Sequence, residues 1–351
     1  MTSTHSWAAT LTTLLAGGNL SVEQASSTMS SVMSGDATSA QLAAFLVALR
    51  AKGETVDEVI GFRDAILSQA RQLDVRPRAL DIVGTGGDQH KTVNVSTTAS
   101  IIAAASGVPV LKHGNRAASS ASGSSDVLAM LGVNLEIEPA DVARVFNEVG
   151  ISFAFAAAFH PGFRHAASTR AEIGIPTIFN ILGPLCNPAR PLASAVGVAS
   201  LERVPLIVGV FQSRDANALV FRGDNGLDEL NTCGHSHVWE VTRGRVIEHD
   251  FDPRDVGLSL ATLEDIRGGA PEENADIVRS TLAGQEGAVR DIVTLNAAAG
   301  LVAFDLIDHP DSVETPLVDR IAAKLAVARE SIDSGSAAAK LDAWVAATNA
   351  L

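Results

Sequence analysis

A glycine-rich turn between an apolar run and a helix start is the first feature of the sequence that could do chemistry. DIV at residues 81–83 leads into GTGGD at 84–88, and NVST at 94–97 opens an Ala/Ile-rich stretch of helical character. Glycine permits positive φ and lacks a Cβ, so backbone N–H groups can approach an anion, and a helix start adds unpaired N–H groups. The turn matches neither G-x-G-x-x-G nor a P-loop. Alone, it fits a phosphate loop and a plain connection equally well.

A second donor-rich segment follows about one strand-helix-strand unit later. It reads KHGNRAASS at 112–120 and continues as GSSD at 123–126. Lysine, arginine and serine supply charged and hydroxyl donors that suit a sugar phosphate. Together the two segments favour a phosphate-binding site over a plain turn.

Composition limits the class of protein that can carry this site. A chain of 351 residues exceeds the usual size of one core, so we expect two domains. The formal net charge of −14 argues against a general nucleic-acid partner. An anionic substrate therefore needs local positive charge, and the candidates are Lys91, Lys112, Arg116, Arg164 and Arg170.

The cysteines and the apolar runs predict a cytoplasmic protein without a membrane partner. Cys186 and Cys233 lack C-x-x-C spacing, so neither a disulfide framework nor a zinc site is indicated. Residues 1–7 show no signal-peptide pattern, and no uncharged apolar span of about 18 residues follows.

The predicted secondary structure that must position the site changes near residue 76 from helices alone to alternating strands and helices. Residues 1 to about 75 carry capping-box signals beginning at Ser21, Thr38 and Thr55, which predict helices. After a Pro-bearing link, apolar runs alternate with helical stretches, which predicts a mainly parallel sheet. The candidate strands are 79–83, 108–111, 151–155, 193–198 and 218–221, followed by a hairpin within 238–250 and helices ending with one from about 318.

These motifs, in this order, resemble those of the anthranilate phosphoribosyltransferases, tryptophan-pathway enzymes that use phosphoribosyl pyrophosphate (PRPP). The resemblance continues through FAAAFHP at 155–161, RAEIG at 170–174, TIFNILGPL at 177–185, NP at 187–188 and GLDEL at 226–230, with weaker matches at 273–275 and 295–298. It implies transfer of the 5-phosphoribosyl group of PRPP to the amine of anthranilate, with release of pyrophosphate.

The resemblance also implies the fold. It is the α/β fold of nucleoside phosphorylases and phosphoribosyltransferases, with a small N-terminal α-helical domain and a larger α/β domain with a mainly parallel central sheet. We place the helical domain at residues 1–76 and the PRPP-binding domain at 77–351. The resemblance implies that the helical domain forms a homodimer and one wall of the substrate cleft between the domains. A segment near 165–190 is expected to pack with the helical domain.

PRPP binding is implied for a group of loop residues. They are Gly84, Gly87, Asp88, Thr92, Asn94, Val95, Ser96, Thr97, Lys112, His113, Gly114, Asn115, Arg116, Ala117, Ala118, Ser119, Ser120 and Ser124. Lys112 is expected to place a point charge over a phosphate, and its alternative is a solvated surface position. For Ser96 and Thr97 the alternative is N-capping of the helix.

Mg²⁺ is the implied cofactor, with Ser96, Asp228 and Glu229 as ligands, because Mg²⁺ prefers hard oxygen ligands beside a pyrophosphate. Alone, the acidic pair would be a solvated turn. The implied anthranilate contacts are Gly84, Asn115 and Arg170, the arginine pairing with the carboxylate in a bidentate fork. The alternative for Arg170 is a surface ion pair with Glu172.

No catalytic acid or base is assigned, because a departing pyrophosphate needs charge neutralisation and positioning more than a base. His113 and His160 are expected to line the substrate or to be structural. The sequence departs from the family pattern at Ala157 (usually proline), Pro176 (arginine in many members) and Arg222 (usually histidine).

Two alternative functions remain open from the sequence. One is a pyrimidine nucleoside phosphorylase of the same fold, whose phosphate loop reads K-x-S-G-R-G instead of KHGNRAASS. The other is a non-catalytic nucleic-acid-binding relative, against which the net charge and the presence of Asn115, Arg170, Asp228 and Glu229 argue.

Overall fold

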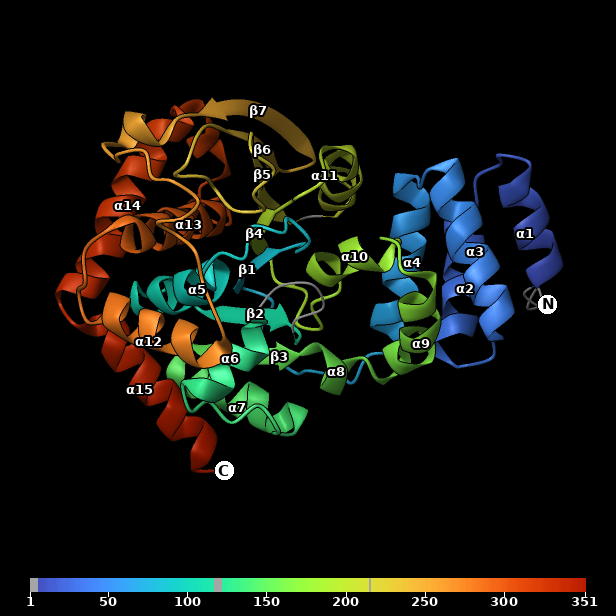
Figure 1. Cartoon of the computed structure of the whole chain (residues 1–351), viewed down its shortest axis with the longest axis horizontal. Helices are drawn as coiled ribbons and strands as arrows, with labels where there is room; N and C mark the ends of the chain where they lie inside the picture. Colours follow the sequence, from blue (N-terminus) through green and yellow to red (C-terminus); the bar gives the residue numbers. More distant parts are fainter. Residues whose placement is uncertain (1–5, 117–121, 215) are drawn as a thin grey trace.

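The computed structural model describes residues 6–116, 122–214 and 216–351. Within them, a bundle of N-terminal helices lies beside a seven-stranded sheet flanked by helices (Figure 1). The strand order is β3-β2-β1-β4-β5-β6-β7. The predicted class, a small helical domain plus a larger α/β domain with a mainly parallel sheet, is confirmed. The boundary near residue 76 stays a prediction.

The N-terminal bundle forms because its helices begin at strong caps and bury one apolar face. Thr38 and Thr55 each accept a hydrogen bond from the backbone three residues later, as Ser21 does, and each capping box is complete. Leu42, Phe45, Leu46 and Leu49 are buried in one core. The helices are α1 (Trp7–Leu15), α2 (Val22–Met33), α3 (Ser39–Lys52) and α4 (Val56–Ser68).

The first five strands along the chain are parallel and the last two form an antiparallel hairpin. The strands are β1 (Leu80–Gly84), β2 (Val110–Gly114), β3 (Ile151–Phe155), β4 (Ala193–Gly197), β5 (Asn217–Gly223), β6 (Ser236–Thr242) and β7 (Arg245–Phe251). The predicted strands and hairpin are confirmed within a few residues. At the hairpin turn Arg243 and Gly244 have φ of 47° and 70°, which suits a two-residue loop whose twist matches the strands.

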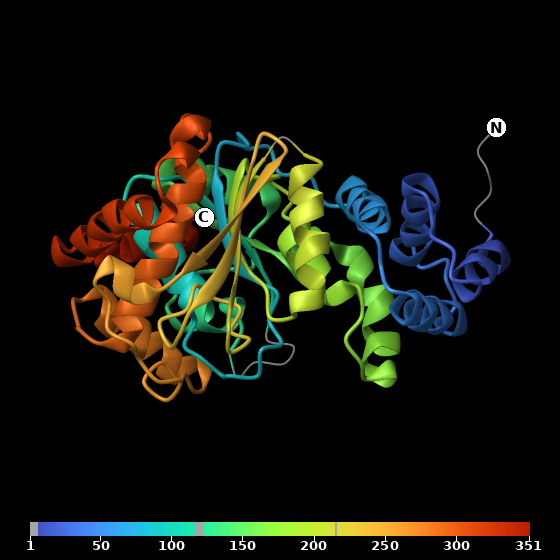
Figure 2. The ribbon, with the colours of Figure 1, turned by 90° about the horizontal axis from the view of Figure 1, so that it is seen from above.

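Helices cover both faces of the sheet (Figure 2). The helices of this part are α5 (Val95–Ala105), α6 (Ser124–Met130), α7 (Pro139–Val149), α8 (Ala156–Phe159), α9 (Arg164–Ile173), α10 (Phe179–Leu182), α11 (Val204–Gln212), α12 (Pro271–Leu282), α13 (Ala288–Asp305), α14 (Leu317–Asp333) and α15 (Ser336–Asn349). Short 3₁₀ turns are η1 (Pro161–Phe163), η2 (Gly183–Leu185), η3 (Leu201–Arg203), η4 (Pro253–Val256) and η5 (Pro310–Glu314). Leu80 and Ile82 of β1 belong to a core shared with α5, α13 and α14, whereas Val83 joins the core on the opposite face with α4, α10 and α11.

The prediction that the chain ends with one helix from about residue 318 is wrong, because two helices, α14 and α15, are present there. Gly335 adopts φ of 77° between α14 and α15. A left-handed glycine ends one helix and lets the chain start another in a new direction.

The helical bundle contacts the α/β part through α9 and α11. The chain leaves β3 through α8, and α9 packs against α2 and α3 (Figure 1). Near the start of α11, Arg203 pairs with the buried Glu54, with 2.6 Å between nitrogen and oxygen. Among the described residues no helix is both long and apolar enough to cross a membrane.

Replacement of Glu58 by alanine tests the buried polar network of the bundle. The Glu58 carboxylate accepts the Leu20 N–H (2.9 Å) and pairs with Lys52 (3.0 Å), and both side chains of the pair are buried. Removing one partner of a buried pair costs about 3 to 5 kcal/mol, so Glu58→Ala should lower the free energy of unfolding in urea by that amount. Glu264→Ala, which removes an exposed pair with Arg267, should change it by less than about 0.5 kcal/mol. Equal losses in the two variants would contradict this assignment.

Candidate active site

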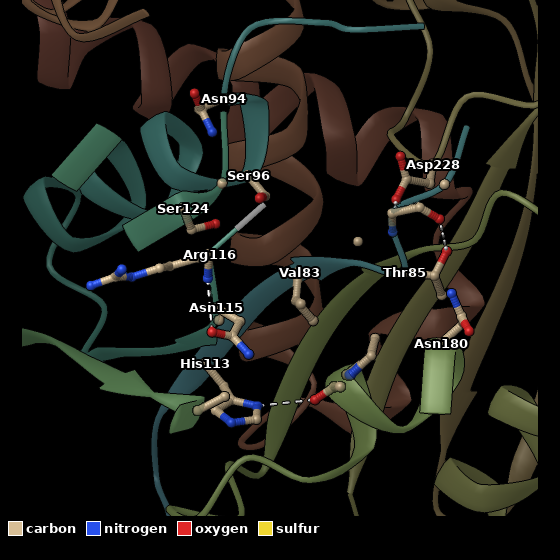
Figure 3. Close-up of a pocket in the computed structure, with 18 of the residues that line it drawn as sticks. Val83, Thr85, Asn94, Ser96, His113, Asn115, Arg116, Ser124, Asn180 and Asp228 are labelled. Atoms are coloured by element: carbon tan, nitrogen blue, oxygen red, sulfur yellow. Dashed lines mark hydrogen bonds between the residues drawn. The ribbon is translucent and has the colours of Figure 1, made fainter. Parts of the chain in front are cut away.

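A cavity of about 650 Å³ opens at the carboxyl ends of β1 and β2 and extends to α9 and α10. Figure 3 shows Asn94, Ser96 and Ser124 on one side of it, Asp228, Thr85 and Asn180 on the other, and Asn115 and His113 below Arg116. This position is the usual one in parallel α/β sheets, because loops and helix starts converge there.

Most of the sequence-predicted site residues line this one cavity. They are Gly84, Gly87, Asp88, Thr92, Asn94, Val95, Ser96, Lys112, His113, Gly114, Asn115, Arg116, Ser124, Arg170, Asp228 and Glu229. Thr97 does not line it, since its side chain is buried in α5. Ala117, Ala118, Ser119 and Ser120 lie outside the described residues. The ligand assigned to each residue stays a prediction.

The glycine-rich loop after β1 contains several residues in the left-handed backbone conformation. Gly86 and Gly87 have φ of 69° and 86°, and the non-glycine residues Gln89 and Lys91 have φ of 64° and 54°. Such turns point successive N–H groups toward one side of the chain, where an anion can bind. The loop could therefore bind an anion, although its sequence matches no familiar phosphate motif.

Two glycines make room for the acidic segment after β5. A Cβ at Gly84 would lie 2.3 Å from Oδ2 of Asp228, and one at Gly197 would lie 1.6 Å from the Asp228 carbonyl oxygen. The carboxylate in turn accepts the Gly86 N–H at 2.6 Å. Close backbone approach thus places Asp228 directly against the glycine loop.

Asp228 and Glu229 are buried, 8% and 9% exposed, so the alternative of a solvated turn is wrong. Burial, with the charge of Asp88 adding to it, raises the pKa of Asp228 to about 7. Burial and the charge of Asp228 raise the pKa of Glu229 well above its usual value, against the charge of Lys112. A bound cation would stabilise both ionised carboxylates.

The donor set fits Mg²⁺ completed by other oxygens. Within the described ranges no group of three or more His, Cys, Asp or Glu side chains could hold a metal ion alone. Mg²⁺ commonly binds one or two carboxylates and takes its remaining ligands from phosphate and water. Ser96 also lines the cavity and could add a hydroxyl.

Lys112 is buried, 1% exposed, so the alternative of a solvated surface lysine is wrong. Its Nζ donates to the Ile82 carbonyl oxygen (2.5 Å) and to Oγ of Ser96 (3.1 Å). Burial lowers its pKa, while the charges of Asp81 and Glu229 oppose that change. The ammonium group therefore links β1, β2 and the first turn of α5 beneath the cavity.

The capping alternative for Ser96 and Thr97 is also wrong. Asn94 occupies the N-cap position of α5, and its side chain makes no capping hydrogen bond. Instead its amide donates to the Ser122 carbonyl oxygen (3.2 Å), and its Oδ1 accepts from Asn274 (2.8 Å). Asn274, which sequence reasoning did not assign to the site, orients Asn94 between two loops of the cavity.

Arg170 lies with its guanidinium 4.9 Å from the centre of the Phe179 ring. Among the described residues it forms no ion pair, so the surface pair with Glu172 is wrong. A cation stacked on an aromatic face keeps its outer N–H groups available for a carboxylate.

Two imidazoles close this end of the cavity, with ring centres 5.2 Å apart. Nδ1 of His113 lies 3.0 Å from the Gly183 carbonyl oxygen, and Nε2 of His160 lies 2.9 Å from that of Cys186. Burial lowers the pKa of His113 to about 3, with His160 adding to the effect, and burial lowers that of His160 to about 4. Both rings are neutral near pH 7 and donate to these carbonyls.

Several residues of the cavity wall were not predicted from the sequence, and most of them belong to the TIFNILGPL segment at 177–185. Phe179, Asn180 and Pro184 line the cavity, as does Phe163. Apolar and amide side chains such as these carry no obvious chemical signal in a sequence, even within a motif that begins at Thr177 and includes Gly183. Phe179, Asn180 and Pro184 reach the cavity because the chain turns back toward the sheet after α9.

The three departures from the family pattern have different surroundings. Ala157 lines the cavity, whereas Pro176 does not. Arg222 donates to the carbonyl oxygens of Ala199 (3.0 Å) and Gly223 (3.1 Å), and so it ties together the ends of β4 and β5.

Replacement of Gly197 by alanine tests the close approach of the acidic segment. The added methyl group would overlap the Asp228 backbone, which cannot rotate away as a side chain can. Overpacking of this kind costs about 3 kcal/mol, so the melting temperature should fall by about 4 °C in calorimetry. Gly183→Ala is the matched control, because its methyl group meets nothing within 4 Å and the backbone is helical. An unchanged melting temperature for Gly197→Ala would contradict the proposed packing.

Both parts of the chain match models of one family. Residues 76–338 match the glycosyl transferase family, a/b domain, and residues 9–70 match the glycosyl transferase family, helical bundle domain. The chain is 65% identical to the anthranilate phosphoribosyltransferase of Leifsonia xyli subsp. xyli, over 99% of this chain and 100% of that one. It is 60% identical to that of Clavibacter michiganensis subsp. michiganensis over 100% of both.

Solved structures agree with these relatives. The anthranilate phosphoribosyltransferase of Thermus thermophilus superposes with a TM-score of 0.88 at 40% identity, over 97% of this chain and 99% of that one. The Saccharomyces cerevisiae enzyme in complex with PRPP and Mg superposes with a TM-score of 0.87 at 27% identity, over 98% of both chains. With this identity over the full length of its relatives, the chain belongs to the anthranilate phosphoribosyltransferase family.

Proposed function

We propose that this chain transfers the 5-phosphoribosyl group of PRPP to the amine of anthranilate, giving N-(5-phosphoribosyl)anthranilate and pyrophosphate. One observation carries the proposal. A single cavity joins an anion-binding loop and a buried acidic pair at one end to Arg170, stacked on Phe179, at the other. The relatives named above support this reaction and not the phosphorylase or nucleic-acid-binding alternatives.

Charge neutralisation and positioning are the main catalytic tasks of the protein. The bond between C1′ and the pyrophosphate oxygen breaks, and the amine nitrogen bonds to C1′ and loses a proton to solvent. Loop N–H groups at 84–88, the first turn of α5 and the nearby basic side chains bind the departing anion. Mg²⁺, when held by Asp228, Glu229 and Ser96, supplies further positive charge for the pyrophosphate.

Anthranilate binding is assigned to the wall of the cavity that contains Arg170. Arg170 pairs with the carboxylate, and Asn115 and the backbone at Gly84 lie within the same cavity. The neutral His113 and His160 hold backbone carbonyls and so are not poised as bases near pH 7. Their role in this proposal is to shape the wall.

Two further features belong to the proposal. We assign a homodimer formed through the helical bundle, and Leu15 of α1 and Val47 of α3 are exposed there, at 78% and 46%. A cytoplasmic location accords with a biosynthetic reaction on soluble substrates.

The fall in anthranilate fluorescence with purified protein, PRPP and Mg²⁺ tests the function. Consumption that requires both PRPP and Mg²⁺ supports it. A folded chain that leaves anthranilate unchanged but splits thymidine or uridine with phosphate would overturn it.

Replacement of Arg170 tests the anthranilate wall. Arg170→Ala removes a charge-assisted pair and should raise the KM for anthranilate about 30-fold or more, with little change in the KM for PRPP. Arg170→Lys should restore only part of the loss, because an ammonium cannot form the planar fork. Arg254→Ala, at an exposed arginine that pairs with Asp252 and does not line the cavity, is the control. Equal effects on both substrates would contradict the assignment.

The raised pKa of Asp228 predicts how pH and Mg²⁺ interact. Below about pH 7 this carboxyl takes up a proton, and the proton competes with the metal. A tenfold increase in Mg²⁺ should therefore move the acid midpoint of kcat/KM for PRPP down by about one pH unit, as long as one proton competes. Rate profiles at two Mg²⁺ concentrations measure the shift. The same midpoint at both would show that these carboxylates do not bind the metal.

A further inference from the structure

The pairing between β1 and β2 stops early. Leu80 lies opposite Val110, and pairing goes no further, whereas β1 pairs with β4 along five residues and β2 pairs with β3 along five. The strands therefore part toward the carboxyl ends that form the cavity.

Side chains bridge the strands where the backbone ladder stops. The Leu111 carbonyl oxygen accepts from Nδ2 of Asn187 (2.8 Å), and the Ile82 carbonyl oxygen accepts from Nζ of Lys112 (2.5 Å). The His113 N–H donates to Oδ1 of Asp81 (3.2 Å). A continued parallel ladder would have paired these backbone groups with each other or with their neighbours. Three side chains thus replace the missing ladder.

Asp81 and Asn187 form one buried unit, 1% and 4% exposed. Oδ2 of Asp81 accepts from Nδ2 of Asn187 at 2.9 Å. The orientation of the Asn187 amide is fixed, because its Oδ1 accepts the Ala189 N–H and its Nδ2 donates to Leu111. Position 81 must therefore present two acceptors, which a carboxylate does and an amide does not.

Neither Asp81 nor Asn187 lines the cavity, but the backbone that they hold does. His113, Gly114 and Asn115 follow directly on the segment that they fix. Burial raises the pKa of Asp81 to about 6, against the charge of Lys112 and the Asn187 and His113 hydrogen bonds, so the carboxylate is mainly ionised at pH 7.

We propose that Asp81 and Asn187 are positioning residues for PRPP binding, which tie the end of β2 to β1 at a fixed spacing and so position the segment 112–115 relative to the glycine loop. The inference rests on the proposed function for its substrate. Without the two acceptors, the end of β2 loses its tie to β1, and Lys112 and Asn115 shift relative to the loop at 84–88. The consequence is weaker PRPP binding.

Asp81→Asn is the most direct test of this inference, because it hardly changes the size of the side chain. It replaces one accepting carboxylate oxygen with a donating NH₂ group. Calorimetric titration with PRPP and Mg²⁺ should give a Kd at least about tenfold higher than that of the unaltered chain, and KM for PRPP should rise more than kcat falls. Glu240→Gln is the matched control. That carboxylate lies on β6, away from the cavity, where it is fully buried and pairs with Arg320 of α14. It should lose thermal stability but keep the PRPP Kd within about twofold.

Asn187→Ala is the second variant, and it decides alone if Asp81→Asn does not fold. It removes the other half of the unit and should also raise the Kd for PRPP. Native-like circular dichroism in either variant with an unchanged Kd would overturn the inference, as would an equal rise in Kd for Glu240→Gln. If the unaltered chain binds PRPP but does not consume anthranilate, the proposed function fails while the binding comparison still decides the positioning role.

Discussion

Burial of charged side chains between β1, β2 and α5 is the constraint on which the rest of the structure depends. Moving an ion from water into a protein interior costs several kcal/mol unless it gains partners. Asp81, Lys112 and Glu229 are all buried here, and Lys112 is influenced by both carboxylates. Each group therefore needs its hydrogen bonds, and those bonds fix the strand ends and the first turn of α5. The glycine loop at 84–88 lies between β1 and α5, which Lys112 links through Ile82 and Ser96.

Two walls of different origin meet in the cavity. The loops of the α/β part contribute backbone donors and the acidic pair, while the return of the chain through α9 and α10 contributes Arg170 and Phe179. Because α9 packs against α2 and α3, the second wall is in contact with the helical bundle. A relative motion of the two parts would change the distance between the walls, which is a common way to exclude water during a transfer reaction.

The sequence predicted what depends on local chemistry. Capping boxes, strand periodicity and the glycine turn each depend on a few neighbouring residues, and the structure confirms the elements that they predict. The break at Gly335 was a local signal that periodicity concealed, since apolar residues continue on both sides of it. Resemblance to a family brought together residues far apart in the chain, which spacing alone could not do.

Tertiary contacts decided the rest. Lys112 reads as a surface lysine until β1 and α5 enclose it, and Ser96 reads as a cap until Asn94 occupies that position. Asn274 and Asn187 carry no chemical signal in the sequence, yet they orient Asn94 and the end of β2 through hydrogen bonds across more than 70 positions of the chain. Such roles depend on which strands become neighbours.

A crystal structure of the chain with PRPP, Mg²⁺ and an unreactive anthranilate analogue would show whether one cavity binds both substrates and the metal as proposed. We expect the pyrophosphate against the loop at 84–88 and the start of α5, the metal on Asp228 and Glu229, and the carboxylate of the analogue on Arg170. The hydrogen bond from the His113 N–H to Asp81 should also be present. A metal bound away from the acidic pair, or a pyrophosphate outside the glycine loop, would contradict the proposal.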